Sequence, residues 1–314
     1  MHILINGWFW GEDTAGSGQY LHHMLQHLPH YAPDCRFTLM MPEFADEEQQ
    51  NTFAKNVTFQ SQPLPNLPRN LAKLWWEQIT IPRMARHLKA HRLWIPYWAT
   101  PYWQPCPTVV TIHDLIPALL PDYQGGWLQR LYTALVSHTA KRAQAVLTIS
   151  HASARDIIQH LKIPADRVHA VHHGPNQEGK ASPSTEDLVA IRRKYNLPER
   201  FFLYLGGFDV RKNVLAIIQA YARYLAQGGD PAVRLVIAGK LPAVDRPFSP
   251  DPRRTVSELD LNEQVHFCGW IDDGDKSAIY ALATAYIFPS LYEGFGMMVL
   301  EAMAAGTAVV TSEA

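Results

Sequence analysis

The stretch AYIFPSLYEGFGMMVLEAM (residues 285–303) predicts a strand, a glycine-containing turn and a helix in direct succession. Its β-branched and aromatic beginning is typical of a buried strand, which would end at Phe288-Pro289-Ser290, and the helix would begin near Gly296. Glycines at 294 and 296 allow a ligand to approach the backbone closely. The N–H groups and the dipole at a helix start favour a bound phosphate.

The same succession of strand and helix runs along the rest of the chain, which predicts parallel sheets covered by helices. The predicted strands are 2–6, 37–41, 93–96, 108–112 and 145–150, followed by 201–205, 233–239, 265–269, 285–290 and 308–312. The predicted helices lie near 18–28, 70–91, 127–142, 151–162, 213–227 and 296–305. The pattern therefore predicts the α/β class with two doubly wound parallel sheets.

One segment interrupts the alternation: HHGPNQEGKASPSTED (172–187) is rich in Gly, Pro, Ser and charge, which suits a connection between domains. We expect an N-terminal domain over 1–172, a linker or hinge over 173–198 and a C-terminal domain over 199–314. The carboxyl ends of two parallel sheets would then face each other across a cleft. Ligands of such folds bind at those strand ends.

The composition excludes several classes of protein. A chain of 314 residues with 47% hydrophobic and 18% charged residues supports packed cores, not disorder or a coiled coil. With 28 Lys+Arg against 29 Asp+Glu, the formal net charge is −1, which argues against a nucleic-acid partner. Three dispersed cysteines suit a reducing compartment. Neither a membrane-spanning run nor a signal peptide is recognisable, so we expect a cytoplasmic protein.

The two carboxylates of the opening stretch stand eight residues apart and would have separate tasks. Glu293 lies in the turn, where it could accept hydrogen bonds from sugar hydroxyls. Glu301 lies two turns into the helix, where it could accept hydrogen bonds from a ribose diol. The alternative is that this strand, turn and helix form an ordinary packing unit and that both glutamates lie on the surface.

A second strand end, FLYLGGFDVRKNV (202–214), combines glycines with cations. Gly206-Gly207 follow the predicted strand, and Arg211-Lys212 stand just before a helix start. Two cations there can neutralise a diphosphate leaving group, Arg with its bidentate fork and Lys as a point charge. A solvated basic pair on a loop is the alternative.

Two further candidates lie in the first half of the chain. His113 falls at the end of the predicted strand in TVVTIHDLIP (108–117), where it could present a ring nitrogen or its carbonyl to a substrate. A histidine packed under a loop is the alternative. Gly16 and Gly18 precede a helix, which suits contact with a phosphate or sugar, but the dinucleotide motif G-x-G-x-x-G is absent.

Together these motifs resemble glycosyltransferase family 4, a group of retaining transferases with the GT-B fold of two Rossmann-like domains. EGFGMMVLEAMAAG (293–306) is similar to the donor-site signature of that family. Residues 147–174 and YLGGFDVRKNV (204–214) match it in order and spacing. TIHDLIP resembles the bacterial mannosyltransferase-like members, which build lipopolysaccharide and surface polysaccharide. The resemblance covers nearly the whole chain.

The resemblance implies catalytic roles for four side chains. Glu293 would contact the donor sugar's hydroxyls, and Lys212 with Arg211 would stabilise the departing diphosphate. His113 would lie near the sugar's 6-hydroxyl and the reaction centre.

The resemblance also implies a set of donor-binding residues. Glu301 would hold the nucleotide ribose, Gly16 and Gly18 would lie close to the phosphates, and the backbone of Phe295-Gly296-Met297 would cap them. Gly207, also expected in the donor site, stands where many family members carry an arginine. We infer that Arg211 takes over that missing charge.

The implied reaction transfers a hexosyl unit, with mannosyl as one candidate, from a nucleotide sugar such as GDP-mannose or a UDP-hexose to a hydroxyl of a glycan or lipid-linked acceptor. It would proceed with retention, without cofactor or metal, through positioning and electrostatic stabilisation. Because family members continue beyond the point where this chain stops, we expect a truncated C-terminal domain. The alternatives are a GT-B sugar-nucleotide epimerase and an inactive nucleotide-sugar-binding fragment.

Two apparent metal motifs have simpler explanations. Asp272-Asp273-Gly274-Asp275 contains a D-x-D pattern, but an aspartate capping the next helix explains it better. His23, His27 and His30 have helical spacing, but Pro29 should end that helix before His30, and an exposed face is expected.

Residues 69–92 combine six cations and only one acid, Glu77, with three nearby tryptophans. This mixture suits a helix at the surface of an anionic membrane. We therefore retain the hypothesis of weak peripheral contact with the inner face of the membrane. A solvated face with core tryptophans is the alternative.

Overall fold

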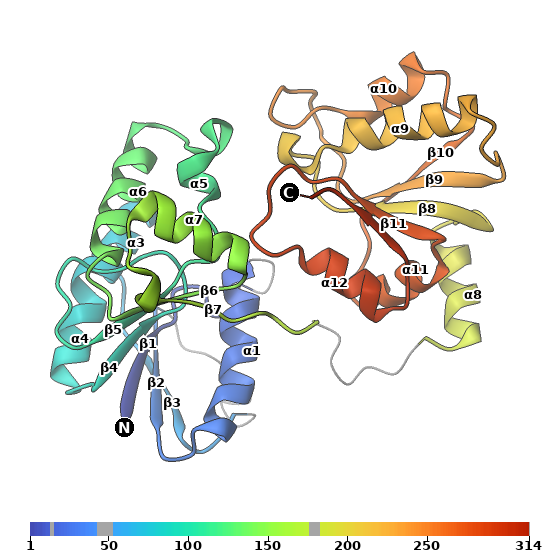
Figure 1. Cartoon of the computed structure of the whole chain (residues 1–314). Helices are drawn as coiled ribbons and strands as arrows, with labels where there is room; N and C mark the ends of the chain where they lie inside the picture. The colour runs from blue at the N-terminus through green and yellow to red at the C-terminus, as the bar shows by residue number, and fades with distance from the viewer. Residues whose placement is uncertain (13–15, 43–52, 176–182, 314) are drawn as a thin grey trace. The chain divides into compact units, whose positions relative to one another are not determined.

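The computed structural model describes residues 1–12, 16–42, 53–175 and 183–313. The chain divides into two compact units, Met1–His172 (unit 1) and His173–Ala314 (unit 2). Most of their helices and strands are labelled in Figure 1.

Unit 1 is built on a seven-stranded parallel sheet in the order β3-β2-β1-β4-β5-β6-β7. Its strands are β1 (His2–Asn6), β2 (Arg36–Met41), β3 (Val57–Ser61), β4 (Arg92–Ile95), β5 (Thr108–Thr111), β6 (Ala145–Thr148) and β7 (Val168–Ala170). The order reverses between β1 and β4, so the sheet is doubly wound. Its topological switch point lies at the carboxyl ends of these two strands.

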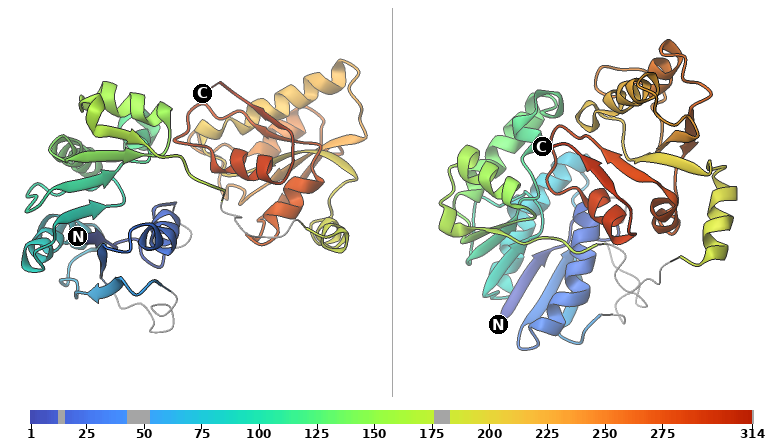
Figure 2. Two further views of the ribbon diagram at one scale, coloured as in Figure 1. Left: turned by 60° about the horizontal axis from the view of Figure 1, so that its bottom comes forward. Right: turned by 45° about the vertical axis from the view of Figure 1, so that its right-hand side comes forward.

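Helices cover both faces of this sheet (Figure 2). They are α1 (Gly16–Tyr31), α3 (Arg69–Trp75), the π-helical turn η1 (Trp76–Thr80), α4 (Ile81–His87), α5 (Ile116–Leu119), η2 (Pro121–Tyr123), α6 (Trp127–Ala140), α7 (His151–Leu161) and η3 (Ala165–Arg167). Leu4 and Leu93 pack with α4, α6 and α7, whereas Ile5 and Trp94 pack with α1. This alternation follows from the two-residue period of a strand.

Unit 2 repeats the design with a five-stranded parallel sheet in the order β10-β9-β8-β11-β12. Its strands are β8 (Arg200–Leu205), β9 (Val233–Ala238), β10 (Val265–Gly269), β11 (Ala285–Phe288) and β12 (Val309–Thr311). The switch point lies between β8 and β11.

The helices of unit 2 also divide between the two faces of its sheet. They are α8 (Thr185–Lys194), η4 (Val210–Lys212), α9 (Val214–Ala226), α10 (Pro252–Glu258), α11 (Lys276–Leu282) and α12 (Met297–Ala304). Leu203 packs with α8, α11 and α12, and Tyr204 packs with α9 and α10. Both faces of β8 are therefore buried, as expected of a central parallel strand.

The predicted α/β class and the two doubly wound parallel sheets are confirmed, and each of the ten predicted strands is present within two residues of its expected ends. The edge strands β3 and β7 were not predicted. Exposed and half-buried residues alternate along β3, so it lacks the continuous apolar run of a central strand. Within the range 173–198, expected as a connection, the chain forms α8, whose Ile191 belongs to the core of unit 2.

Helix α1 differs from its prediction at the C-terminal end. It continues through Pro29 to Tyr31, so the expected stop before His30 is wrong. Pro29 lies in the last turn, where little of the helix remains to be disrupted, and Ala32 N–H donates to the Leu28 carbonyl at 3.1 Å. Pro29 is also one of the buried residues of this helix. The predicted exposed histidine face, His23, His27 and His30, is confirmed.

The basic segment 69–92 forms α3, η1 and α4. Trp76 and Trp94 are core residues, whereas Trp75 is 44% exposed. Two of the cations have acidic partners, since Arg69 pairs with Glu12 and Lys73 with Glu77. Among the helices in the described ranges, none combines the length and the apolar character needed to cross a bilayer.

Candidate functional site

The switch point of the unit 2 sheet brings together two segments that are far apart in sequence. β8 and β11 pair in parallel, with Phe202 opposite Ala285. The residues that follow them then meet: Leu291 N–H donates to the Arg211 carbonyl at 2.8 Å, and Asn213 Nδ2 donates to the Pro289 carbonyl at 3.3 Å. Because ligands of open α/β sheets bind beyond the strand ends at this point, it is the candidate site.

Four charged side chains, Asp209, Arg211, Lys212 and Glu293, form a charge cluster at this point. Arg211 Nη1 and Lys212 Nζ both contact Glu293 Oε1, at 2.6 and 2.7 Å. Arg211 Nε lies 3.4 Å from Asp209 Oδ1. The side chains of Arg211, Lys212 and Glu293 are only 12%, 11% and 20% exposed. Two cations and two carboxylates thus balance one another at a largely buried strand end.

The surroundings of Glu293 keep its carboxylate ionised. Burial by itself raises the pKa of this group, but the attraction and hydrogen bond of Lys212 and the attraction of Arg211 outweigh it. The net result is a pKa below the ordinary value of 4.5. At neutral pH Glu293 is therefore a charged acceptor for hydrogen bonds.

The local backbone explains why both cations reach the same carboxylate. Val210–Lys212 form a single 3₁₀ turn, and Asn213 then adopts a left-handed conformation with φ of 56° before α9 begins. Asparagine tolerates this conformation better than most residues. Lys212 Nζ also lies 4.9 Å from the centre of the Phe288 ring, a cation–π contact at the end of β11.

A close backbone crossing lies at the ends of β8 and β9. Gly239 has φ of 134°, and a Cβ atom at this position would overlap the carbonyl oxygen of Gly206. Gly207, in contrast, has room for a side chain, because a Cβ there would make only an ordinary contact with Asp209. The carbonyl of Gly207 accepts a hydrogen bond from the Tyr204 hydroxyl. Glycine is thus required by packing at 239 and not at 207.

The turn before α12 has the predicted form. Gly296 is left-handed, with φ of 87°, and Met297 is the first residue of the helix. The first N–H groups of a helix lack partners within it, so they are donors for an anion. The Phe295 ring lies 5.6 Å from the ring of His173.

Glu301 is not part of the charge cluster. It lies on α12, is 6% exposed, and its Oε2 is 3.5 Å from the Tyr280 hydroxyl of α11. The structure thus separates the two glutamates of the signature, with Glu293 beside the cations and Glu301 against a tyrosine.

The site residues predicted in the first half of the chain belong to unit 1. His113 follows β5, and its ring packs edge-on against Tyr20 of α1, with ring centres 4.9 Å apart. Gly18 is buried, and a Cβ there would overlap the carbonyl oxygens of Phe9 and Glu12. No atom of the described residues lies within 4 Å of such an atom at Gly16. Packing therefore accounts for Gly18, whereas none of the described residues of unit 1 requires a glycine at 16.

A buried polar network at the switch point of unit 1 was not predicted. Asn6, the last residue of β1, donates to the Tyr97 hydroxyl at 2.8 Å and accepts from Trp76 Nε1 at 2.8 Å. Glu77 is 1% exposed, accepts from the Tyr132 hydroxyl at 2.9 Å and pairs with Lys73.

Burial raises the pKa of Glu77, although Lys73 and the hydrogen bonds from Tyr132 and Tyr97 act in the opposite direction. The ammonium of Lys73 lies between 4.9 and 5.8 Å from the rings of Phe9, Tyr97 and Tyr132. The i, i+4 spacing of Lys73 and Glu77 was the only signal of this network in the sequence.

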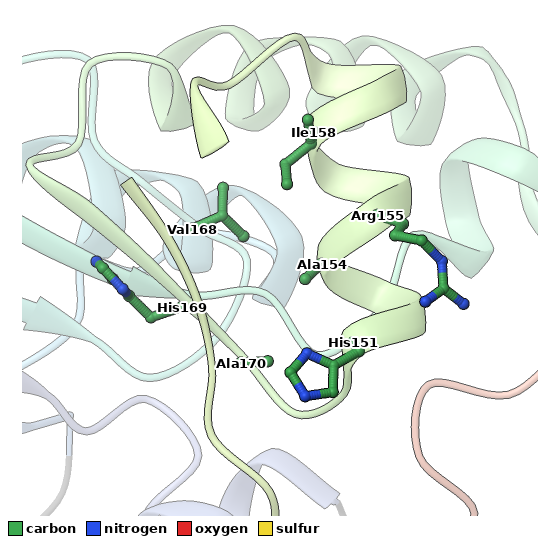
Figure 3. Close-up of a pocket in the computed structure, with 7 residues that line it drawn as sticks. All are labelled: His151, Ala154, Arg155, Ile158, Val168, His169 and Ala170. Carbon is green, nitrogen blue, oxygen red and sulfur yellow. The ribbon is translucent and has the colours of Figure 1, made fainter. Parts of the chain in front are cut away.

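A pocket of about 540 Å³ lies elsewhere on unit 1, between α7 and β7 (Figure 3). It is lined by His151, Ala154, Arg155, Ile158, Val168, His169 and Ala170. In Figure 3 the side chains of His169 and Arg155 point away from each other. None of the predicted site residues lines this pocket, so it is not the candidate site.

Within the described ranges, no three His, Cys, Asp or Glu side chains gather in a way that could hold a metal ion. Both aspartates of the D-x-D pattern pair with lysines: Asp273 lies 2.6 Å from Lys276 Nζ, and Asp275 accepts from Lys194 Nζ at 2.6 Å. The neighbouring Asp272 also accepts from Lys194 Nζ, at 2.7 Å. Asp275 occupies the N-cap position of α11, but its side chain makes no capping hydrogen bond. The expected capping role is therefore wrong, and an ion pair with α8 takes its place.

Models of two families match this chain. The model described as Glycosyltransferase Family 4 matches residues 14–178, and the model described as Glycosyl transferases group 1 matches residues 190–314. The first match alone covers more than half of the chain.

Curated relatives and solved structures agree with these matches. The serotype-specific mannosyltransferase WbdA of Escherichia coli is 33% identical over 66% of this chain and 25% of its own length. The O-antigen chain mannosyltransferase B of E. coli is 29% identical over 65% of this chain and 52% of its own. The chain thus spans a quarter to about half the length of these relatives.

The crystal structure of Anabaena Alr3699/HepE in complex with UDP and glucose superposes with a TM-score of 0.68 at 17% identity, covering 99% of this chain and 80% of that one. At this identity the likeness shows the fold alone.

Proposed function

The chain belongs to glycosyltransferase family 4, and on that premise we propose that it transfers a hexosyl unit, with mannosyl favoured, from a nucleotide sugar to an acceptor hydroxyl. The acceptor is a glycan or lipid-linked glycan of lipopolysaccharide or surface polysaccharide synthesis. The mannosyl and O-antigen assignments of the similar proteins support the sugar and the acceptor class. The UDP and glucose in the HepE structure support a nucleotide-sugar donor.

The observation that carries the proposal is the charge cluster. Two cations and an ionised glutamate meet at the switch point of unit 2, beside a helix start with donors for an anion. A nucleotide sugar presents a diphosphate next to a polyhydroxylated ring. The cluster offers both complementary groups, cations for the diphosphate and a carboxylate for the hydroxyls.

In this mechanism Lys212, assisted by Arg211, stabilises the negative charge of the leaving diphosphate, and Glu293 orients the sugar through its hydroxyls. Glu301 accepts hydrogen bonds from the ribose, and His113 contributes near the reaction centre. Transfer proceeds with retention, without a protein nucleophile, cofactor or metal, as the diphosphate helps to deprotonate the acceptor hydroxyl.

Binding of the donor is the first test. The melting temperature should rise with the concentration of GDP-mannose, UDP-glucose or UDP-N-acetylglucosamine, because a ligand of the native state stabilises it. Lys212→Ala and Glu293→Ala should each abolish most of this rise in melting temperature, or most of the sugar-transfer activity, without unfolding the protein. If none of the three nucleotide sugars produces a shift, the proposed function is wrong.

Membrane contact is a separate part of the proposal. We place the protein in the cytoplasm, with weak peripheral contact through residues 69–92, in which Arg83 and Arg86 are exposed and Trp75 is 44% exposed. Liposomes containing anionic lipid should retain the protein in a flotation assay at low salt. Equal recovery of the protein with neutral and with anionic liposomes would contradict the proposed membrane contact, and the proposed transferase function would be unaffected.

A further inference from the structure

The two cations of the charge cluster have different surroundings, and the inference rests on that difference together with the proposed function. Arg211 is tied to the segment after β11 at three points. Its Nη1 contacts Glu293 Oε1 at 2.6 Å and donates to the Tyr292 carbonyl at 2.9 Å. Its own carbonyl accepts from Leu291 N–H at 2.8 Å. Arg211 therefore fastens the turn after β8 to the turn after β11.

Among the described residues, Lys212 contacts β11 and the turn after it through its side chain, while its backbone N–H donates to the Asp209 carbonyl at 2.9 Å within its own turn. Its ammonium donates to Glu293 Oε1 at 2.7 Å and faces the Phe288 ring. A lysine ammonium is a compact charge on a flexible stem with three donors. It can exchange one anionic oxygen for another by rotation of its side chain, without moving the backbone.

The carboxylate shared by both cations sets up a competition. In the cluster as described, Glu293 neutralises the charge that a diphosphate would need, and Asp209 lies 3.4 Å from the Arg211 guanidinium. A diphosphate that enters must draw a cation away from Glu293. Lys212 can be drawn away at the loss of one ion pair and its contact with the Phe288 ring, whereas Arg211 would lose its contacts with Glu293 and Asp209 and its hydrogen bond to the Tyr292 carbonyl.

We propose that Arg211 is a positioning residue that holds Glu293 and its turn in place for the sugar, and that Lys212 alone leaves Glu293 to bind the diphosphate. Glu293 then has two functions. It contacts the sugar of the donor, and it competes with the diphosphate for Lys212, which weakens the binding of the nucleoside diphosphate product.

Binding measurements separate these roles and need no acceptor. Dissociation constants for UDP and GDP, and for UDP-glucose and GDP-mannose, are measured by calorimetry on the whole chain. Lys212→Met should weaken the diphosphate and the nucleotide sugar alike, by about 30-fold, because a charge-assisted contact is lost. Glu293→Gln should tighten the nucleoside diphosphate by about threefold, because the competing carboxylate is gone, and should weaken the nucleotide sugar.

Arg211→Met should change the affinity for the nucleoside diphosphate by less than about threefold, yet weaken the nucleotide sugar by about as much as Glu293→Gln. The double variant Arg211→Met/Glu293→Gln should bind the nucleotide sugar no more weakly than Glu293→Gln alone, because Arg211 acts through Glu293. Arg211→Gln, which keeps a donor for the Tyr292 carbonyl, should retain part of the affinity for the nucleotide sugar that Arg211→Met loses. Each variant is first checked for a native melting transition.

Arg234→Met serves as the control, because Arg234 is an exposed cation at the amino end of β9, and its dissociation constants should match the wild type. If Arg211→Met and Lys212→Met weaken the nucleoside diphosphate equally, Arg211 contacts the diphosphate and the proposal is wrong while the proposed function stands. If the wild-type chain binds none of the four ligands, the proposed function fails and this inference fails with it.

Discussion

At Glu293, a largely buried carboxylate stays ionised because two cations meet one of its oxygens. A group whose pKa is lower in the folded chain adds stability above its unfolded pKa, here 4.5, and loses it as the pH falls through the folded value. The wild type should therefore lose stability below about pH 4.5 more steeply than Glu293→Gln does. Melting temperatures between pH 3 and 7 measure the difference.

The control for this prediction is Glu263→Gln, which removes an exposed carboxylate from the same unit. If the curves of melting temperature against pH are parallel for Glu293→Gln and Glu263→Gln, the ion pairs of Glu293 add no stability.

Glu77 is the opposite case, because burial raises its pKa above 4.5. Such a group adds stability below its unfolded pKa and loses it as the pH rises through the folded value. Lys73→Met should lower the free energy of unfolding by about 3 kcal/mol at neutral pH, because it leaves a buried carboxylate without its cation. The loss should be smaller at pH 5 than at pH 8, as protonation of Glu77 removes the unpaired charge.

Urea unfolding at the two pH values checks this prediction. Arg83→Met removes an exposed cation of the neighbouring helix and should change stability by less than about 0.5 kcal/mol. The double variant Lys73→Met/Glu77→Gln should recover part of the free energy of unfolding that Lys73→Met alone loses. Equal stability of Lys73→Met and Arg83→Met would show that the pair is not needed.

At the scale of the element, the π-helical turn η1 explains how two adjacent residues both enter the core of unit 1. Trp76 is fully buried and Glu77 is 1% exposed, although consecutive residues of an α-helix point in directions about 100° apart. The wider turn places Trp76 Nε1 on Asn6 and the Glu77 carboxylate on Tyr132. π-helical turns are frequent at functional sites, and this one lies beside the switch point of its sheet.

The beginning of α1 allows packing and ligand binding to be distinguished. Gly18→Ala should lower the free energy of unfolding by about 2 kcal/mol or more, because its Cβ would overlap backbone carbonyl oxygens. Gly16→Ala should be neutral or stabilising by up to about 1 kcal/mol, since no atom of the described residues lies within 4 Å of the added Cβ. Urea unfolding of both variants checks these values. A Gly16→Ala variant of native stability that binds nucleotide sugar more weakly would support the phosphate contact expected at Gly16, and unchanged binding would refute it.

At the scale of the whole molecule, each unit has its own hydrophobic clusters, so we expect two cooperative unfolding transitions. Eight of the nine tryptophans belong to unit 1, and only Trp270 belongs to unit 2. Tryptophan fluorescence therefore follows unit 1, whereas far-UV circular dichroism follows both units. UDP or GDP at about 100 times its dissociation constant should stabilise its binding unit by about 2.7 kcal/mol.

If unit 2 provides most of the nucleotide contacts, the circular dichroism transition of unit 2 should move farther than the fluorescence transition. Trp270→Phe is the control, because Trp270 is 63% exposed and its loss should leave the fluorescence transition unchanged. A single transition that moves equally in both measurements would contradict the assignment of the nucleotide site to unit 2.

The sequence by itself determined the α/β class, ten of the strands and the chemical character of the strand ends, because strand periodicity, glycine turns and helix starts are local properties. The tertiary structure alone decided which of those groups meet. Arg211 and Lys212 share one oxygen of Glu293, 81 residues away from Lys212, because β8 and β11 pair across a switch point that no local pattern specifies. The buried network of Glu77 and the ion pair of Asp275 with Lys194 depend in the same way on packing between distant elements.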